Sequence, residues 1–239
     1  MCAKTVYQYT PEMEHYLISP GGIDETLDFA KIFGNDHPVE IEIGTGKGRF
    51  ILAESLLRPA TNFLGIERSR KWLRIALLRA AYLPRANCFF LCLDADLVVK
   101  LLILPQSVSA YHIYFPDPWP KERHHKRRLF NPRFVEKTAQ TLIPQGRLFL
   151  KTDHTDYFAE AHANIVAGGF FQVREQRISE ESISDFDEAP DTATHYEVKF
   201  RQESRKIYTA SYQVTDVIQP DERKIQDFNT DKLHYNNKH

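Results

Sequence analysis

Short β-rich segments alternate with helical segments through most of this chain, and that alternation limits the folds open to it. Five runs of branched and aromatic residues, bounded by Gly, Pro, Asn or Asp, are typical of strands: 39–43, 62–67, 87–93, 110–115 and 146–152. Four segments between them have helical spacing of apolar residues: 49–57, 69–83, 132–142 and 157–167. The alternation implies βαβ crossovers, so we expect an α/β fold with a mostly parallel sheet covered on both faces.

The pattern changes near the end of the chain. Residues 168–176 predict a further strand, and 207–214 predict a last strand that completes the sheet. Between them, THYE (194–197) has the capping-box pattern that begins a helix. We expect one domain over residues 38–215, with a polar N-terminal arm (1–37) and a C-terminal tail (216–239) that is disordered.

Length and composition agree with a single domain of this kind. A chain of 239 residues can bury a full core, and no apolar run is long enough to cross a bilayer, so we expect no membrane association. Residues 1–20 do not resemble a signal peptide. The three cysteines have no companions at metal-ligand spacing, which predicts reduced thiols in a cytoplasmic protein and no metal site.

Charge is unevenly distributed along the chain although the net charge is only −1. Residues 68–93 contain six Lys or Arg and no acid, and a second basic cluster occupies 121–128. By contrast, 178–198 contains seven acids and no Lys or Arg. A molecule polarised in this way can bind a polyanion on one side without being basic overall, so nucleic acid is a candidate partner.

A glycine-rich turn, EIGTGKG (42–48), follows the first predicted strand and precedes the first predicted helix. Gly44, Gly46 and Gly48 allow the backbone to turn sharply and to approach a ligand closely. The spacing differs from that of a phosphate-binding P-loop, because Lys47 lacks the usual spacer and is followed by glycine. It also differs from the dinucleotide fingerprint, whose third glycine comes one residue later.

Acidic residues near the ends of the first three predicted strands narrow the choice of ligand. Parallel strand ends share one edge of the sheet, where ligands bind. Glu67 is placed to accept both hydroxyls of a ribose, Glu42 suits an amino-acid ammonium better than a pyrophosphate, and Asp94 could accept from the adenine amine. Together they favour S-adenosylmethionine over a dinucleotide. The alternative is that these acids only cap the helices that follow.

The segment FPDPWPKERHHKRR (115–128) directly follows the fourth predicted strand. In one interpretation its prolines stiffen a surface loop and its cations are solvated. In the other, the corner holds Asp117 in the crevice that the glycine turn borders, while the cations bind a polyanion. The second interpretation requires the Gly44 turn and the Asp117 corner to border a single cavity.

With these motifs in order, the sequence resembles the tRNA (guanine-N7-)-methyltransferases. The resemblance runs from about residue 39 to 212 and rests on EIGTGKG, GIER, LDAD, FPDPWPKERHHKRR, KTD (151–153) and THYE. It implies a Rossmann-like class I methyltransferase fold with a seven-stranded sheet and an antiparallel last strand. It also implies S-adenosylmethionine as the methyl donor and N7 of guanosine 46, in the variable loop of tRNA, as the acceptor. Whether the enzyme is a monomer or a homodimer stays open.

The resemblance also assigns roles to residues, with Asp117 as the catalytic candidate. The implied cofactor residues are Glu42, Gly44, Gly46, Gly48, Glu67, Asp94 and Asp117. The implied substrate residues are Lys121, Asp153, Thr194, His195, Tyr196 and Glu197. Candidate contacts to tRNA phosphates are Arg70, Lys71, Arg74, Arg123, Lys126, Arg127 and Arg128. His195 and Tyr196 depart from the family pattern, which has a basic residue and Phe.

The implied chemistry is consistent with these residue types. Guanine N7 carries a lone pair and no proton, so the transfer requires alignment of the reacting atoms and no general base. Asp153 or Glu197 could accept the N1 and N2 hydrogens of guanine. For Thr194 and Glu197, a helix-capping role is an equal alternative. Two other functions are alternatives: a nicotinamide-dependent oxidoreductase, which Glu42 argues against, and a noncatalytic RNA-binding module.

Overall fold

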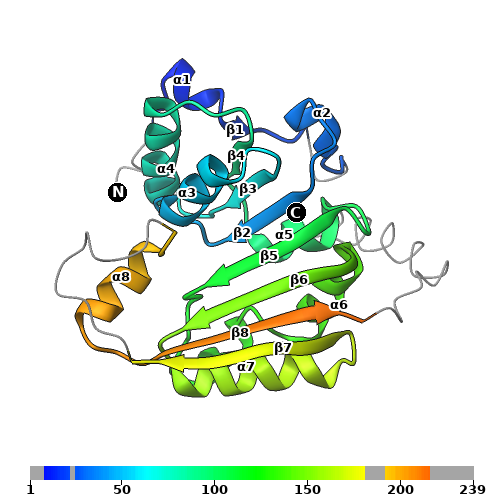
Figure 1. Ribbon diagram of the computed structural model, residues 1–239, viewed down its shortest axis with the longest axis vertical. Coiled ribbons are helices and arrows are strands. Elements are labelled where there is room, and N and C mark those ends of the chain that lie inside the picture. The colour runs from blue at the N-terminus through cyan, green and yellow to red at the C-terminus, as the bar shows by residue number, and fades with distance from the viewer. Residues whose placement is uncertain (1–7, 22–24, 181–191, 216–239) are drawn as a thin grey trace.

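The computed structural model describes residues 8–21, 25–180 and 192–215. Within them, one eight-stranded sheet has the strand order β1-β4-β3-β2-β5-β6-β8-β7 (Figure 1). The first six strands run parallel, and β8 is antiparallel to both of its neighbours. The strands are β1 (Leu17–Ile18), β2 (Val39–Ile43), β3 (Asn62–Ile66), β4 (Cys88–Leu91), β5 (Val108–Tyr114), β6 (Leu142–Thr152), β7 (Phe171–Ser179) and β8 (Ile207–Val214).

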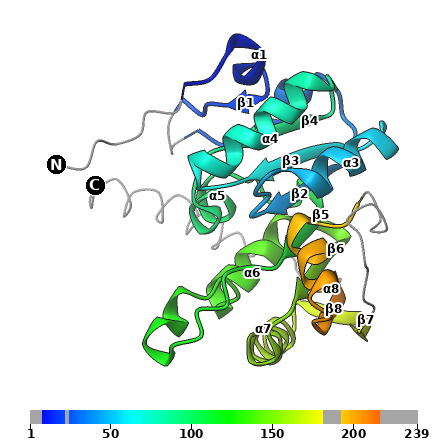
Figure 2. The same ribbon diagram turned by 90° about the vertical axis from the view of Figure 1, so that its left-hand side faces the viewer.

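Helices cover both faces of the sheet, as the alternating pattern predicts. Figure 2 shows α3 and α8 on one side and α5 and α6 on the other. Two adjacent residues of β5 illustrate this: the ring of His112 packs against Phe50 of α3, whereas the Tyr111 hydroxyl bonds Thr141 of α6. The helices are α1 (Pro11–Glu14), α2 (Phe29–Phe33), α3 (Arg49–Leu57), α4 (Arg70–Tyr82), α5 (Ala95–Leu101), α6 (Pro132–Thr141), α7 (Thr155–Ala167), α8 (His195–Gln202) and the 3₁₀ helix η1 (Glu122–Arg127).

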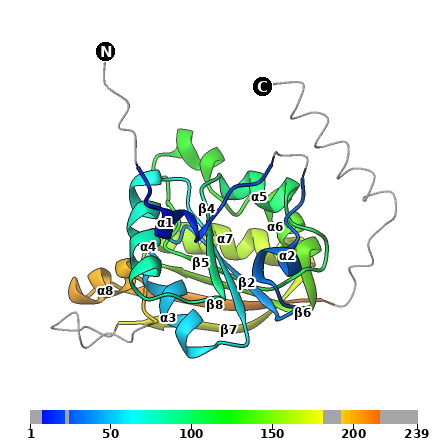
Figure 3. The same ribbon diagram turned by 90° about the horizontal axis from the view of Figure 1, so that it is seen from above.

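The predicted elements are present, and the structure adds one strand, β1, and the short helices α1, α2, α5 and η1. The expected α/β class and the antiparallel last strand are confirmed, but the sheet has eight strands and not seven. The extra strand, β1, comes from the segment we expected to be an arm. Met13 and Tyr16 are buried, α1 packs beside α4 (Figure 3), and Tyr16 accepts a backbone hydrogen bond from Phe90. The predicted tail, 216–239, lies outside the described residues.

The segments that the sequence motifs occupy lie at the carboxyl ends of the strands. The carboxyl ends of β2, β3, β5 and β6 lead into the glycine turn, the start of α4, the 115–121 corner and the start of α7. Figure 1 shows α8 beside the ends of β5 and β6. In the part of the chain that the structure describes, no helix is both long enough and apolar enough to span a membrane.

Candidate active site

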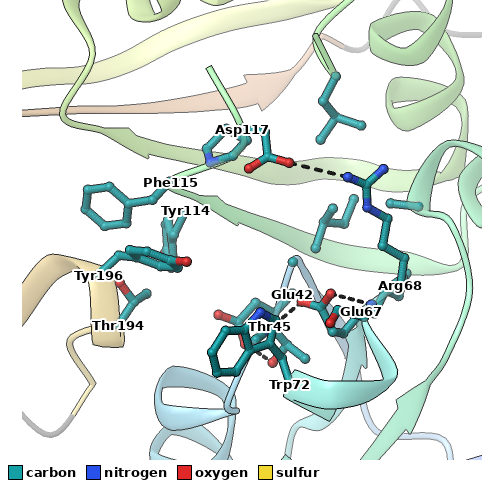
Figure 4. A pocket seen from close by; sticks show the side chains of 18 of the residues that line it. Glu42, Thr45, Glu67, Arg68, Trp72, Tyr114, Phe115, Asp117, Thr194 and Tyr196 are labelled. Atoms are coloured by element: carbon teal, nitrogen blue, oxygen red, sulfur yellow. Dashed lines mark hydrogen bonds and ion pairs between the residues drawn. The ribbon is translucent and has the colours of Figure 1, made fainter. Parts of the chain in front are cut away.

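A cavity of about 950 Å³ lies at the carboxyl ends of these strands. Its lining includes the glycine turn and the strand-end acids on one side and the Asp117 corner on the other, with the first turn of α8 completing the wall (Figure 4). The Gly44 turn and the Asp117 corner therefore border one cavity. Segments distant in the sequence meet here because parallel strands end at the same edge of the sheet.

The three glycines of the turn have positive φ angles but different surroundings. Gly44 (φ +77°) and Gly46 (φ +55°) line the cavity, and a β-carbon on either would find open space or a distant backbone oxygen. Gly48 (φ +73°) does not line the cavity. A β-carbon there would lie 2.9 Å from the β-carbon of Ala76 in α4. The assignment of Gly48 to cofactor contact is corrected: it permits close packing of α3 on α4.

Glu67 joins the glycine turn to the start of α4. One carboxylate oxygen accepts a hydrogen bond from the Gly46 amide at 3.0 Å, and the other accepts from the Ser69 amide at 2.7 Å. Each oxygen has further lone pairs. Glu67 also lines the cavity, so it is a fixed acceptor that can take a pair of neighbouring hydroxyl groups.

Glu42 is the most buried of the cavity acids, with only 4% of its surface exposed. Burial raises the pKa of Glu42 to about 8; the Thr45 hydroxyl, which donates to its carboxylate, opposes the rise, and the charge of Glu67 adds to it. At pH 7 the carboxyl is therefore mostly protonated, and a cation beside it would favour ionisation. Glu42 is suited to hold an ammonium group.

Asp94 caps the helix that follows it and also lines the cavity. Its side chain caps α5 by accepting from the Asp96 amide at 3.0 Å. Asp94 and Asp96 both line the cavity. Capping one helix with one oxygen leaves the other oxygen of Asp94 for a ligand.

The Asp117 corner is held in an uncommon backbone conformation. Phe115 (φ +52°) and Trp119 (φ +44°) occupy the left-handed region, which is unfavourable for large side chains. Arg128 supports this conformation by donating to the Pro118 carbonyl at 2.9 Å and by pairing with Glu160 of α7. Strained backbone that surrounding contacts maintain is a common feature of functional sites.

The Asp117 side chain itself is 70% exposed. It pairs with Arg68, at 3.4 Å, across the mouth of the cavity (Figure 4). An exposed pair of this length contributes little to stability. A ligand can therefore displace it at small cost.

The opposite wall is formed by α8 and the end of β6. Thr194 caps α8 by accepting from the Glu197 amide at 3.0 Å, and Thr194, His195 and Tyr196 line the cavity. Lys47 of the glycine turn donates to the His195 ring at 3.2 Å, which ties α8 to the turn. Burial and the nearby cations, Lys47 first among them, lower the pKa of His195, so its ring is neutral at pH 7.

Comparison with known proteins identifies the family. A family model described as "Putative methyltransferase" matches residues 36–210. The chain is 35% identical to the tRNA (guanine-N(7)-)-methyltransferase of Rhodopirellula baltica over 208 residues, covering 84% of this chain and 75% of that protein. It is 32% identical over 201 residues to the protein of the same name from Oceanobacillus iheyensis, covering 84% of this chain and 92% of that one.

The chain belongs to the tRNA (guanine-N(7)-)-methyltransferase family. It is therefore a methyltransferase, as the sequence motifs imply. Among solved structures, a mutant 16S rRNA (adenine(1408)-N(1))-methyltransferase with cosubstrate SAM, from Catenulisporales acidiphilia, has a TM-score of 0.56 and 15% identity, covering 81% of this chain and 94% of that one. This likeness confirms the methyltransferase fold.

Besides Gly48, two residues do not fit the predicted roles, because both are buried in ion pairs. Arg128 is only 5% exposed and is occupied by Pro118 and Glu160, so it cannot reach a tRNA phosphate. Glu197 is buried between Lys151 (2.9 Å) and Arg201 (3.0 Å) and does not line the cavity, so its carboxylate holds two cations, which is neither the guanine contact nor the capping role expected of it. Lys121 is exposed at the start of η1, outside the cavity lining, so its contact with the tRNA substrate stays a prediction.

The other basic residues named from the sequence are on the surface. Arg123, Lys126 and Arg127 are exposed on η1, and Lys126 and Arg127 also line the cavity. Arg70, Lys71 and Arg74 are exposed on α4 outside the lining. Both sets remain available to a polyanion.

Several lining residues were not predicted from the sequence. Thr45 lies within EIGTGKG and Arg68 within GIER, so both could have been inferred from these motifs. Phe200 and Arg205 belong to no motif, and they line the cavity because α8 lies beside the ends of β5 and β6.

Proposed function

We propose that this chain transfers a methyl group from S-adenosylmethionine to N7 of guanosine 46 in the variable loop of tRNA. The observation that carries the proposal is the single cavity bordered by the glycine turn with its acids and by the Asp117 corner. The names of the two relatives support guanine N7 in tRNA as the acceptor. The donor follows from the chemistry of the acids, and position 46 follows from the resemblance.

The residues of the donor side suit S-adenosylmethionine. Gly44 and Gly46 leave open space where the backbone meets the cavity. Glu67, fixed by two backbone amides, can accept the two ribose hydroxyls, and buried Glu42 can pair with the ammonium. When bound, this donor supplies an electrophilic methyl group on a sulfonium sulfur. A dinucleotide would instead bring a pyrophosphate toward Glu42, which argues against a nicotinamide enzyme.

The acceptor requires positioning more than proton transfer. Guanine N7 attacks through a lone pair, so the chain's contribution is to hold the base in line and to keep water out. The base becomes positively charged as the methyl group arrives, and Asp117 can replace its exposed contact with Arg68 by an interaction with that charge. Only the part of this interaction that is stronger in the transition state than beforehand accelerates the reaction.

Binding of the tRNA itself would use the exposed cations beside the cavity. Arg123, Lys126 and Arg127 on η1 are available for phosphates. Their binding energy can offset the cost of displacing the target guanosine from the tertiary fold of the tRNA, a few kcal/mol. A tRNA substrate is also consistent with a cytoplasmic enzyme.

The test is to incubate the protein with methyl-labelled S-adenosylmethionine and an unmodified tRNA transcript, and then to digest the RNA to nucleosides. The label is expected in 7-methylguanosine, and a transcript with adenosine at position 46 should accept none. The variant Asp117→Ala is expected to lose transfer. Label in another nucleoside, or equal transfer to the adenosine-46 transcript, would show that the proposal is wrong.

A further inference from the structure

Arg205 lies just after α8, on the wall of the cavity opposite the glycine turn. Its Nη1 donates to Asp153 Oδ2 at 2.8 Å, and its Nε pairs with Glu203 at 2.7 Å. The guanidinium carbon lies 4.7 Å from the ring centroid of Phe200. These three contacts hold the Arg205 side chain in place. It is still 49% exposed and lines the cavity, so a ligand can reach it.

We propose that Arg205 is a specificity-determining residue, which together with Asp153 selects the Watson–Crick edge of guanine. The inference rests on the proposed function. It adds a residue that none of the sequence motifs contains.

The two side chains offer the pattern of groups that guanine requires. Guanine presents two donors, on N2 and N1, followed by one acceptor, O6. Asp153 accepts from Arg205 through Oδ2, so Oδ1 remains for the two donors. Arg205 has five N–H donors, and its two ion pairs involve Nη1 and Nε, so Nη2 remains for O6.

Adenine presents the reverse pattern. It has an amino donor where guanine has O6, and an acceptor where guanine has the N1 hydrogen. Arg205 would then face a donor, and Asp153 would face a lone pair. Polar sites left unpaired in this way reject the wrong ligand by several orders of magnitude.

A cation beside the base does not oppose the reaction in this setting. Arg205 is accompanied by Asp153 and Glu203, so the group carries one positive and two negative charges. The net charge of −1 is favourable for a purine that becomes cationic. Arg205 can therefore recognise O6 without disfavouring methylation at N7.

Aromatic rings beside the ion pair provide a surface for the face of the base. The Phe115 and Phe200 rings are 5.3 Å apart, and the Tyr196 and Phe200 rings are 5.9 Å apart with planes tilted by 31°. Tyr196 is 50% exposed and lines the cavity. Stacking on such rings is indifferent to base identity. Discrimination then falls to the ion pair.

The test compares three transcripts that differ only in the target base: guanine, hypoxanthine, which lacks the N2 amino group, and 2-aminopurine, which lacks O6 and the N1 hydrogen. The affinity of wild type and of Arg205→Met for each transcript is measured in the presence of S-adenosylhomocysteine. Arg205→Met should weaken binding of the first two by about tenfold, the worth of one charged hydrogen bond. Affinity for the 2-aminopurine transcript should differ less than about twofold between the variant and wild type, because this base has no O6 for Arg205 to contact in either protein.

Equal weakening for all three transcripts, or no weakening for any, would overturn the inference. The first result would mean that Arg205 only holds α8 in place. The matched control is Arg177→Met on β7, which removes an exposed arginine that pairs with Glu175 outside the cavity and should leave all three affinities unchanged. S-adenosylhomocysteine affinity, measured separately, reports whether each variant keeps an intact donor site. Failure of the wild type to form 7-methylguanosine would count against the proposed function, whereas the pattern across bases tests Arg205.

Discussion

Replacing Glu42 by glutamine is expected to stabilise the fold and to weaken donor binding in the same protein. Glu42 is buried beside Thr45, and its carboxyl has no cation partner among the described contacts. Glutamine keeps an oxygen that can accept from the Thr45 hydroxyl, but it cannot ionise. The substitution therefore removes a buried ionisable group, which the proposed function assigns to the ammonium of the donor.

The magnitude follows from the pKa of Glu42. The side chain titrates at 4.5 when unperturbed and at about 8 in the native fold. Below pH 4.5 it is neutral in both states and has no effect on stability. As the pH rises from 4.5 to 8, the unfolded chain ionises first, so each pH unit lowers the free energy of unfolding by about 1.4 kcal/mol. At pH 7 the loss is on the order of 3 kcal/mol, and it stops growing above pH 8.

The assay is urea denaturation of wild type and Glu42→Gln at three pH values near 5, 7 and 8.5. The stability gap should be small at the lowest pH and should widen in favour of the variant as the pH rises. Glu122→Gln, which alters an exposed residue of η1, should differ from wild type by less than about 0.5 kcal/mol throughout. A gap for Glu42→Gln that is the same at all three pH values would refute the buried-carboxyl argument.

Three further predictions concern the donor, the tRNA and the fold. Calorimetric titration with S-adenosylmethionine at pH 7 should release nearly one proton as Glu42 ionises, so the heats should differ between phosphate and Tris; identical heats would contradict this. The double variant Lys126→Ala/Arg127→Ala should raise KM for tRNA and flatten its salt dependence, and an unchanged salt slope would mean that these cations are only solvated. Gly48→Ala should lower stability by about 1–3 kcal/mol more than Gly34→Ala, which has a similar φ but open space around its β-carbon; equal losses would assign the whole effect to backbone strain.

Periodicity and bounding residues were sufficient to predict most of the fold. The helix expected at 49–57 has those bounds in the structure, because its apolar spacing and the preceding glycine agree. Strand β1 was missed because a pair of residues has no periodicity. Its position depends on the burial of Met13 and Tyr16 by distant segments, which local sequence does not specify.

The site was predictable where topology determines it. Acids at parallel strand ends share one edge, so the meeting of Glu67 with the Asp117 corner followed from the order of the strands. The burial and pairing of individual charged side chains could not be predicted from the sequence, because their partners are far away along the chain. Arg128 pairs with Glu160 and Glu197 pairs with Lys151, and nothing near either residue indicates burial.

The most direct test of the central claim is a crystal structure of this protein with S-adenosylhomocysteine. We expect the ligand to lie in the large cavity, with its ammonium within hydrogen-bonding distance of Glu42, about 3 Å, and its ribose hydroxyls on Glu67. The Asp117 corner should border the sulfur. A ligand bound elsewhere, for example in the smaller hollow beside Asn35, or bound with its ribose away from Glu67, would contradict the account.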